Sequence, residues 1–140
     1  MKTLFESLSS SNVDDSMYNI LVIVKPGFLD KTADIIKRFA EKGWTVGRIK
    51  TKQLLRDEAK RIYEPVKQEE WFEDLCDYMI SDLTTAILFT KDKHMDSNMF
   101  KETNKLKDKI RNEFGESEMR NVMHSSDSLE RLQIERGIYF

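Results

Sequence analysis

The chain has 140 residues, of which 39% are hydrophobic and 34% charged, and its formal net charge is −2. This length suits one domain with a substantial core, and the composition is that of a folded protein rather than a disordered one. The near balance of charge argues against nonspecific nucleic-acid binding as the main task, because such binding needs an excess of basic residues.

Cysteine content and hydropathy exclude further kinds of site and location. The single cysteine, Cys76, excludes an intrachain disulfide, and no Cys/His cluster has the spacing of a zinc site. The longest apolar runs, such as residues 20–24, are too short to span a bilayer, and residues 1–16 lack the apolar segment of a secretory signal. We therefore expect a cytoplasmic protein that has neither a membrane nor a specific nucleic acid as its partner.

The first part of the chain predicts a leader and a central strand. Residues 1–16 are rich in Ser, Asn and Asp and are predicted to be flexible, so residues 17–140 form the predicted domain. The continuous apolar run at residues 20–24 predicts a central strand that is covered on both faces. Lys25-Pro26-Gly27 ends this strand and leaves Lys25 at its C-terminal tip.

A helix and a second strand come next. The helix is predicted to stop at Gly43, since glycine commonly ends a helix. Residues 44–54 then predict a strand, with Trp44, Val46 and Ile49 facing the core.

The remaining elements complete an alternating pattern. Helices are predicted at residues 56–64, 68–80, 95–101 and 127–136. Strands are predicted at residues 86–89 and 119–123, and a connector at residues 110–114. This order suggests two split β-α-β units. We therefore predict an α+β, ferredoxin-like fold with a four-stranded antiparallel sheet and helices on one face.

The segment at residues 120–128 carries the most specific information. His124 follows two apolar residues and precedes a run of small polar ones, in which Asp127 and Glu130 predict the N-cap and capping box of the last helix. His124 would then lie at a strand-to-helix junction, where free N–H groups favour a bound anion. Imidazole can also act as a nucleophile near neutral pH. By itself, a lone histidine more often has a purely structural role.

The sequence Asn-Val-Met-His-Ser-Ser-Asp-Ser around His124, with Glu135 eleven residues later, resembles the active-site segment of the nucleoside diphosphate kinases. The resemblance extends over residues 17–140. It implies that His124 is the phosphorylated nucleophile. It also implies that Glu135 accepts a hydrogen bond from the histidine nitrogen that stays protonated.

Further motifs in the same order support the resemblance. Lys25-Pro26-Gly27 is similar to the family's Lys-Pro-Asp-Gly, which implies that Lys25 contacts the sugar hydroxyl and the transferring phosphate. By the same resemblance, Tyr63 lies beside the catalytic histidine and Trp71 stacks on the nucleotide base.

The phosphate and sugar contacts follow from three later matches. Thr103, in Glu-Thr-Asn, and Arg111, in Ile-Arg-Asn-Glu-Phe, resemble the residues that bind phosphate in the family. Asn121 resembles the residue that holds the ribose hydroxyl. The resemblance also implies Mg²⁺, which bridges the nucleotide phosphates and is held mainly by them.

Without the resemblance, several of these residues have structural interpretations. Tyr63 and Trp71 would serve equally well as core residues. Lys25 and Arg111 would serve as surface cations, and Glu135 as a solvent-facing residue of the last helix.

The chain also departs from the family pattern. Ser97 stands where the family has a phosphate-binding arginine, and Glu118 stands where a small apolar residue faces the stacking aromatic. The loop at residues 104–110 is shorter than usual, and no C-terminal extension follows Phe140. The last two departures predict a homo-oligomer that is a dimer or tetramer rather than a hexamer.

The predicted function is transfer of the γ-phosphate of a nucleoside triphosphate to a nucleoside diphosphate, by a ping-pong route through phospho-His124. The alternative is a nucleotide-binding family member with weak or no kinase activity, since Ser97 removes one phosphate contact. A structural or partner-binding domain is a third interpretation, which leaves the ordered motifs unexplained.

Overall fold

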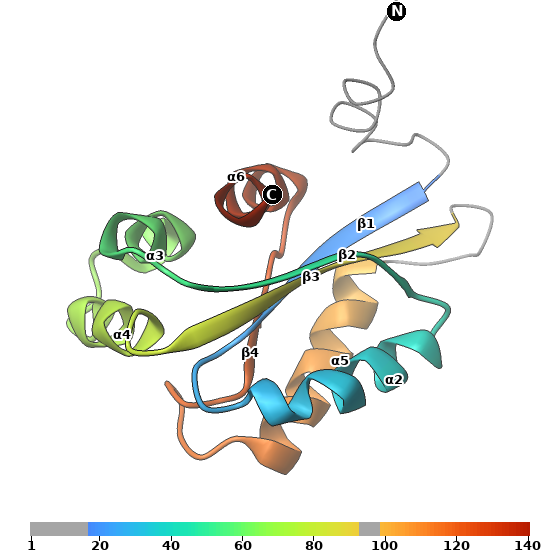
Figure 1. The fold of residues 1–140 in the computed structure, drawn as a ribbon, viewed down its shortest axis with the longest axis horizontal. Coiled ribbons are helices and arrows are strands. Elements are labelled where there is room, and N and C mark those ends of the chain that lie inside the picture. The colour runs from blue at the N-terminus through green and yellow to red at the C-terminus, as the bar shows by residue number, and fades with distance from the viewer. Residues whose placement is uncertain (1–16, 93–98) are drawn as a thin grey trace, which may run out of the picture.

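The computed structural model describes residues 17–92 and 99–140, so the predicted leader, His94 and Ser97 lie outside the described residues. Its strands are β1 (Met17–Val24), β2 (Thr45–Gln53), β3 (Leu83–Asp92) and β4 (Met123–Ser125). They form one sheet in the order β2-β3-β1-β4, and all neighbours are antiparallel (Figure 1). The predicted α+β, ferredoxin-like fold is confirmed.

Helices cover both faces of this sheet. One face carries α3 (Arg56–Ile62), α4 (Phe72–Met79) and α6 (Leu129–Tyr139), with the short 3₁₀ helix η2 (Glu64–Val66) after α3. The other carries α2 (Thr32–Ala40) and α5 (Met99–Phe114), with the 3₁₀ helix η1 (Leu29–Lys31) before α2 (Figure 1). The prediction of helices on one face was wrong.

The reason lies in the central strand β1. Residues 20–24 are all fully buried, as the continuous apolar run predicted. Successive side chains of a strand point to opposite faces, so Leu21 and Ile23 join one core while Ile20 and Val22 join the other. A strand that is apolar on both faces therefore requires helices on both faces.

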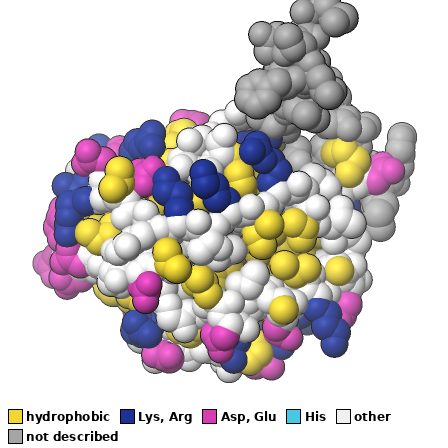
Figure 2. All heavy atoms as spheres, in the orientation of Figure 1, with side chains coloured by type: hydrophobic (Ala, Val, Ile, Leu, Met, Phe, Trp, Pro, Cys, Tyr) yellow, Lys and Arg dark blue, Asp and Glu magenta, His cyan; other side chains and the backbone are white. Residues whose placement is uncertain are grey.

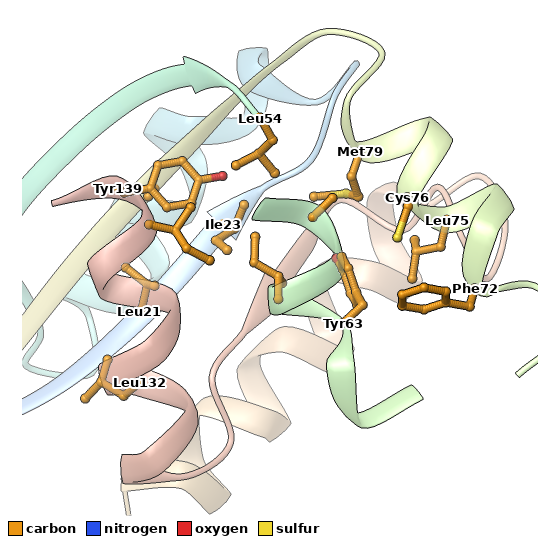
Figure 3. Close-up of a cluster of buried hydrophobic side chains, with 14 of the residues drawn as sticks. Leu21, Ile23, Leu54, Tyr63, Phe72, Leu75, Cys76, Met79, Leu132 and Tyr139 are labelled. Atoms are coloured by element: carbon orange, nitrogen blue, oxygen red, sulfur yellow. The ribbon is translucent and has the colours of Figure 1, made fainter. Parts of the chain in front are cut away.

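The core between the sheet and helices α3, α4 and α6 also supports the elements that carry the candidate site. Figure 3 shows Leu21 and Ile23 of β1 facing side chains from these three helices, among them Leu75 of α4 and Leu132 of α6. Tyr63, directly after α3, belongs to the same cluster. Burying an aliphatic or aromatic side chain of this size stabilises the fold by about 1.5–3 kcal/mol.

The other core contains a stacked aromatic pair, and the edge strand β2 lies beside it. Phe39 of α2 and Phe89 of β3 stack with their centroids 4.5 Å apart. Trp44 is buried as predicted, but Val46 and Ile49 are 39% and 50% exposed, so the prediction that they face the core was wrong. A bulge between Val46 and Arg48 interrupts the alternation of this edge strand.

Two helix boundaries differ from the prediction. The predicted connector at residues 110–114 is the last part of α5, and the described part of the predicted helix at 95–101 is the first turn of α5. The last helix is capped by Ser128, whose Oγ accepts the backbone N–H of Arg131 at 3.2 Å, and not by Asp127.

The fourth strand is also shorter and later than predicted. Residues 116–120 form a turn in which the Arg120 carbonyl accepts the backbone N–H groups of Glu116 and Ser117. Val122 then has a positive φ of 83°, which no regular strand accommodates. Pairing with β1 therefore begins only at Met123.

None of the helices within residues 17–92 and 99–140 has the length and apolar character needed to cross a bilayer.

Candidate functional site

A cavity of about 780 Å³ opens between α3 and α4 on one side and α5 and the segment before β4 on the other. Seven of the eight predicted site residues line it: Lys25, Tyr63, Trp71, Arg111, Asn121, His124 and Glu135. Thr103 is the exception. It is only 1% exposed inside α5, and its hydroxyl donates to the Met99 carbonyl at 2.6 Å.

His124 is fixed by a buried carboxylate. Its backbone pairs with Ile23 of β1, and its Nε2 lies 2.6 Å from Oε1 of Glu135 on α6. Glu135 is 1% exposed, which excludes the solvent-facing interpretation. The same carboxylate accepts the hydroxyl of Ser126 at 3.0 Å and Nε–H of Arg131 at 3.3 Å.

This arrangement determines which ring nitrogen is available. An ionised carboxylate only accepts hydrogen bonds, so Nε2 of His124 carries the proton and Nδ1 keeps its lone pair. Burial raises the pKa of the Glu135 carboxyl, but its interactions with His124, Ser126 and Arg131 together hold it below its usual value. Glu135 is therefore an anion that fixes the histidine tautomer.

Tyr63 packs edge-on against the imidazole. The two ring centroids are 5.1 Å apart and the planes meet at 68°. Burial raises the pKa of the Tyr63 phenol, so it stays protonated. The buried Tyr63 hydroxyl and the buried hydroxyl of Ser125, which also lines the cavity, have no hydrogen-bond partner in the described part of the chain. Buried polar groups are normally paired, so these two favour a polar ligand in the cavity.

Lys25 directly follows β1, as predicted, and it lines the cavity. Its Nζ donates to Oδ1 of Asn121 at 2.7 Å and to the Met119 carbonyl at 3.2 Å, although the residue is only 3% exposed. Burial, together with the charges of Arg111 and Lys107, lowers the pKa of Lys25 to about 7. A bound anion would relieve this repulsion.

Arg111 reaches the site from α5. Its Nε and Nη2 both donate to the carbonyl of Met123, at 3.0 and 2.7 Å. This pair of bonds holds the backbone directly before His124. The guanidinium also lines the cavity, so it faces the same space as Lys25.

Between Asn121 and His124 the backbone is strained. Val122 has φ of 83°, and the Met123 N–H donates to the Asn121 carbonyl at 3.1 Å, which is the bond of a γ-turn. A β-branched residue in this region costs about 1–3 kcal/mol. The Lys25 N–H donates to the Val122 carbonyl at 2.8 Å, and this bond helps to hold the turn. The strain lets Asn121 face the cavity while His124 pairs with β1.

Trp71 and Glu118 line the outer part of the cavity. Trp71, at the start of α4, is 45% exposed, so it is not a core residue. The Glu118 carbonyl accepts Nδ2–H of Asn121 at 2.7 Å, which orders the segment before β4. A half-exposed indole beside a cavity can stack on a planar ligand.

Two further cations at the site were not predicted from the sequence. Lys107 lines the cavity one helical turn before Arg111, and Arg131 joins Glu135 to the carbonyls of Arg61 and Ile62 at the end of α3. The four-residue spacing between Lys107 and Arg111 could have indicated the first. The long-range contacts of Arg131 leave no local sequence signal.

The site offers few metal ligands. Within the described residues no group of three His, Cys, Asp or Glu side chains could hold a metal ion. Three carboxylates line the cavity: Glu118, Asp127 and Glu135. Glu135 is committed to its three hydrogen-bond donors, so a divalent ion here would need ligands from a bound phosphate.

Comparison with known proteins gives a consistent result. The family model described as nucleoside diphosphate kinase matches residues 19–140. The nucleoside diphosphate kinase of a Nitratiruptor species is 33% identical over 131 residues, covering 89% of this chain and 96% of that protein. The enzyme of that name from Fervidobacterium nodosum is 28% identical over 131 residues, covering 89% of each chain.

Solved structures agree with this result. The nucleoside diphosphate kinase of Aquifex aeolicus has a TM-score of 0.70 and 25% identity, covering 89% of this chain and 95% of that one. That of Encephalitozoon cuniculi superposes with a TM-score of 0.76 at 21% identity, covering 87% of this chain and 88% of the other, which supports the shared fold.

Proposed function

Because the chain belongs to the nucleoside diphosphate kinase family, we propose that it moves the γ-phosphate of a nucleoside triphosphate to a nucleoside diphosphate through phospho-His124. The observation that carries this proposal is the 2.6 Å contact between His124 Nε2 and Glu135, inside a cavity lined with cations. It leaves the Nδ1 lone pair for the phosphoryl group.

The reaction has two half-reactions. In the first, the Nδ1 lone pair of His124 forms a bond to the γ-phosphorus as the bond to the β–γ bridging oxygen breaks, and the nucleoside diphosphate leaves with that electron pair. Glu135 stabilises the positive charge that develops on the imidazole. In the second, a terminal oxygen of another nucleoside diphosphate attacks the same phosphorus, and the bond to Nδ1 breaks.

The other site residues bind and orient the nucleotide. Lys25 and Arg111 neutralise the phosphates, since both already crowd the cavity with positive charge. Asn121 holds the ribose hydroxyl and Trp71 stacks on the base. Thr103 is left to pack α5, because its hydroxyl is bonded within the helix.

Mg²⁺ fits this site as an ion that binds together with the nucleotide rather than as one that the protein holds by itself. The described residues lack a cluster of three ligands, so the phosphates would supply most of the coordination. When bound, the ion neutralises charge on the phosphate oxygens.

The test follows the phosphoryl group through both half-reactions. The protein is incubated with γ-labelled ATP and Mg²⁺, freed of nucleotide, and then given an unlabelled nucleoside diphosphate. The proposal expects label on the protein and its transfer to the second nucleotide. Nucleotide binding without any label would instead establish the alternative, a family member without kinase activity.

We also propose a two-fold dimer built on the β2 edge. Figure 2 shows hydrophobic side chains exposed on the face where β2 lies, and Val46 and Ile49 are two such residues of that strand. The 104–110 segment is helical here instead of forming a projecting loop. We therefore expect a smaller contact area around a three-fold axis. Two-fold pairs are the commonest closed assemblies.

Light scattering after a sizing column tests this assembly. The unmodified chain should have the mass of a dimer or tetramer, and Ile49→Lys should shift it toward monomer. Leu129→Lys, which places the same charge at an exposed leucine of α6, is the matched control and should leave the mass unchanged. A hexamer at low concentration would contradict the proposal.

A further inference from the structure

Lys107 is a cation that lines the cavity without a direct partner among the described residues. It lines the cavity and is half-buried, yet it forms no hydrogen bond or ion pair within residues 17–92 and 99–140. It lies outside the motifs around Thr103 and Arg111. A lysine with an ordinary structural role would reach solvent or a carboxylate, so its position calls for a ligand.

Its neighbours make the position costly. Arg111 follows one turn later on the same face of α5, and Lys25 approaches from β1. Burial lowers the pKa of Lys107 and the charge of Arg111 lowers it further, while the charge of Lys107 in turn lowers that of Lys25. Three like charges converge on one cavity, an arrangement that an anion of high charge would stabilise.

The anionic groups near Lys107 indicate which end of the cavity it faces. The carboxylates whose charges act on it are Asp108, its neighbour on α5, and Asp127 and Glu135. Glu135 contacts His124 at 2.6 Å, and Asp127 follows His124 closely in the segment between β4 and α6. Lys107 therefore faces the end of the cavity where the phosphoryl group moves.

The course of α5 explains how a lysine comes to this position. The segment at residues 104–110 continues the helix, so Thr103, Lys107 and Arg111 lie on one face at intervals of four residues. Thr103 is buried behind them, with its hydroxyl bonded to the Met99 carbonyl. Along this face, the first side chain that reaches the cavity is that of Lys107.

We propose that Lys107 is a phosphate-binding residue that contacts the terminal phosphoryl group of the nucleotide, together with Lys25 and Arg111. This inference rests on the proposed function, because it assigns the nucleotide phosphates to the same cavity. It adds a contact that the motifs do not contain. The ammonium supplies a compact charge and up to three donors to the phosphoryl oxygens.

The experiment compares Lys107→Gln with a matched control. Lys105→Gln removes the same charge from the same helix, but Lys105 is exposed on roughly the opposite side and does not line the cavity. Binding of ATP, ADP and AMP is measured by calorimetry without Mg²⁺, and thermal unfolding is followed for each variant. Lys107→Arg tests rescue by a second cation.

The expected loss of affinity grows with the number of phosphates in the nucleotide. Lys107→Gln should weaken ATP binding by about tenfold to a hundredfold, which is the usual effect of losing one hydrogen bond to a charged group, while AMP binding changes little. Lys107→Arg should recover most of the loss, and Lys105→Gln should bind like the unmodified chain. Equal loss for ATP and AMP, or equal loss in both glutamine variants, would overturn the inference.

The outcomes separate this inference from the proposed function. If the unmodified chain binds ATP and transfers label but Lys107→Gln matches it in ATP affinity, the kinase proposal stands and the role of Lys107 falls. If the unmodified chain binds no nucleotide, the proposed function falls first. A variant that no longer unfolds cooperatively is replaced by Lys107→Met, which keeps the length of the side chain.

Discussion

Glu135→Gln tests the fixed histidine tautomer most sharply. Glu135 accepts three donors, from His124 at 2.6 Å, Ser126 at 3.0 Å and Arg131 at 3.3 Å. Glutamine has the same shape but only one oxygen. If that oxygen faces His124, the amide N–H₂ points at the Arg131 guanidinium, and two donors face each other.

The other orientation of the amide is worse for catalysis. Its N–H₂ would then donate to Nε2 of His124, and the proton would move to Nδ1, which is the proposed nucleophile. In either case the anion that balances the imidazolium is lost. Removing one hydrogen bond to a charged group costs about 1.5–3 kcal/mol, which corresponds to roughly 10- to 150-fold in kcat.

The assay is steady-state transfer from ATP to a second nucleoside diphosphate. Glu130→Gln is the matched control, because Glu130 is exposed on the same helix. We expect kcat to fall at least about tenfold for Glu135→Gln, with KM little changed, and the control to behave normally. Equal rates for the two variants would refute the role of Glu135.

Three further predictions concern nucleotide binding and stability. Because the pKa of Lys25 is about 7 in the free cavity and phosphate favours its charged form, nucleotide affinity measured by calorimetry should fall as pH rises from 7 to 9. Lys25→Arg, which stays charged, should flatten this profile. Trp71→Ala should raise the nucleotide KM by about tenfold or more with kcat nearly unchanged, and Trp71→Phe should recover most of it. Ser128→Ala should lower the free energy of unfolding by about 1 kcal/mol in denaturant titrations, since it removes the cap of α6.

Each of these has an outcome that contradicts it. A pH profile that is as steep in Lys25→Arg as in the unmodified chain would assign the titration to another group. If Trp71→Ala changes kcat but not KM, the indole does not bind the base. Ser128→Asp keeps an acceptor at the cap, so a loss equal to that of Ser128→Ala would show that the cap bond is not responsible.

The sequence predicted most of the sheet because its strongest signals are local. The apolar run at residues 20–24 indicated a strand buried on both faces, and the structure buries all five residues. The motif around His124 indicated the residues that meet in the cavity, although no local pattern brings Glu135 or Tyr63 to it. That step depended on the resemblance to a family, which records contacts that spacing alone does not reveal.

The wrong predictions come from places where long-range contacts override local preference. Asp127 and Ser128 are both good N-caps, and Ser128 is the one that caps α6. The positive φ of Val122 could not be predicted from the sequence, because a β-branched residue favours a strand. Val46 and Ile49 read as core residues, but β2 is an edge strand whose exposed face has no partner among the described residues.

The central claim is that His124 carries the phosphoryl group, and the chain offers an internal control, since His94 is its only other histidine. After incubation with γ-labelled ATP and Mg²⁺, the unmodified chain and His94→Ala should both hold a label that is lost in acid and kept in base, as expected for phosphohistidine. His124→Ala should hold none, while keeping its fold and its affinity for nucleotide. An acid-labile label of undiminished amount on His124→Ala would contradict the account.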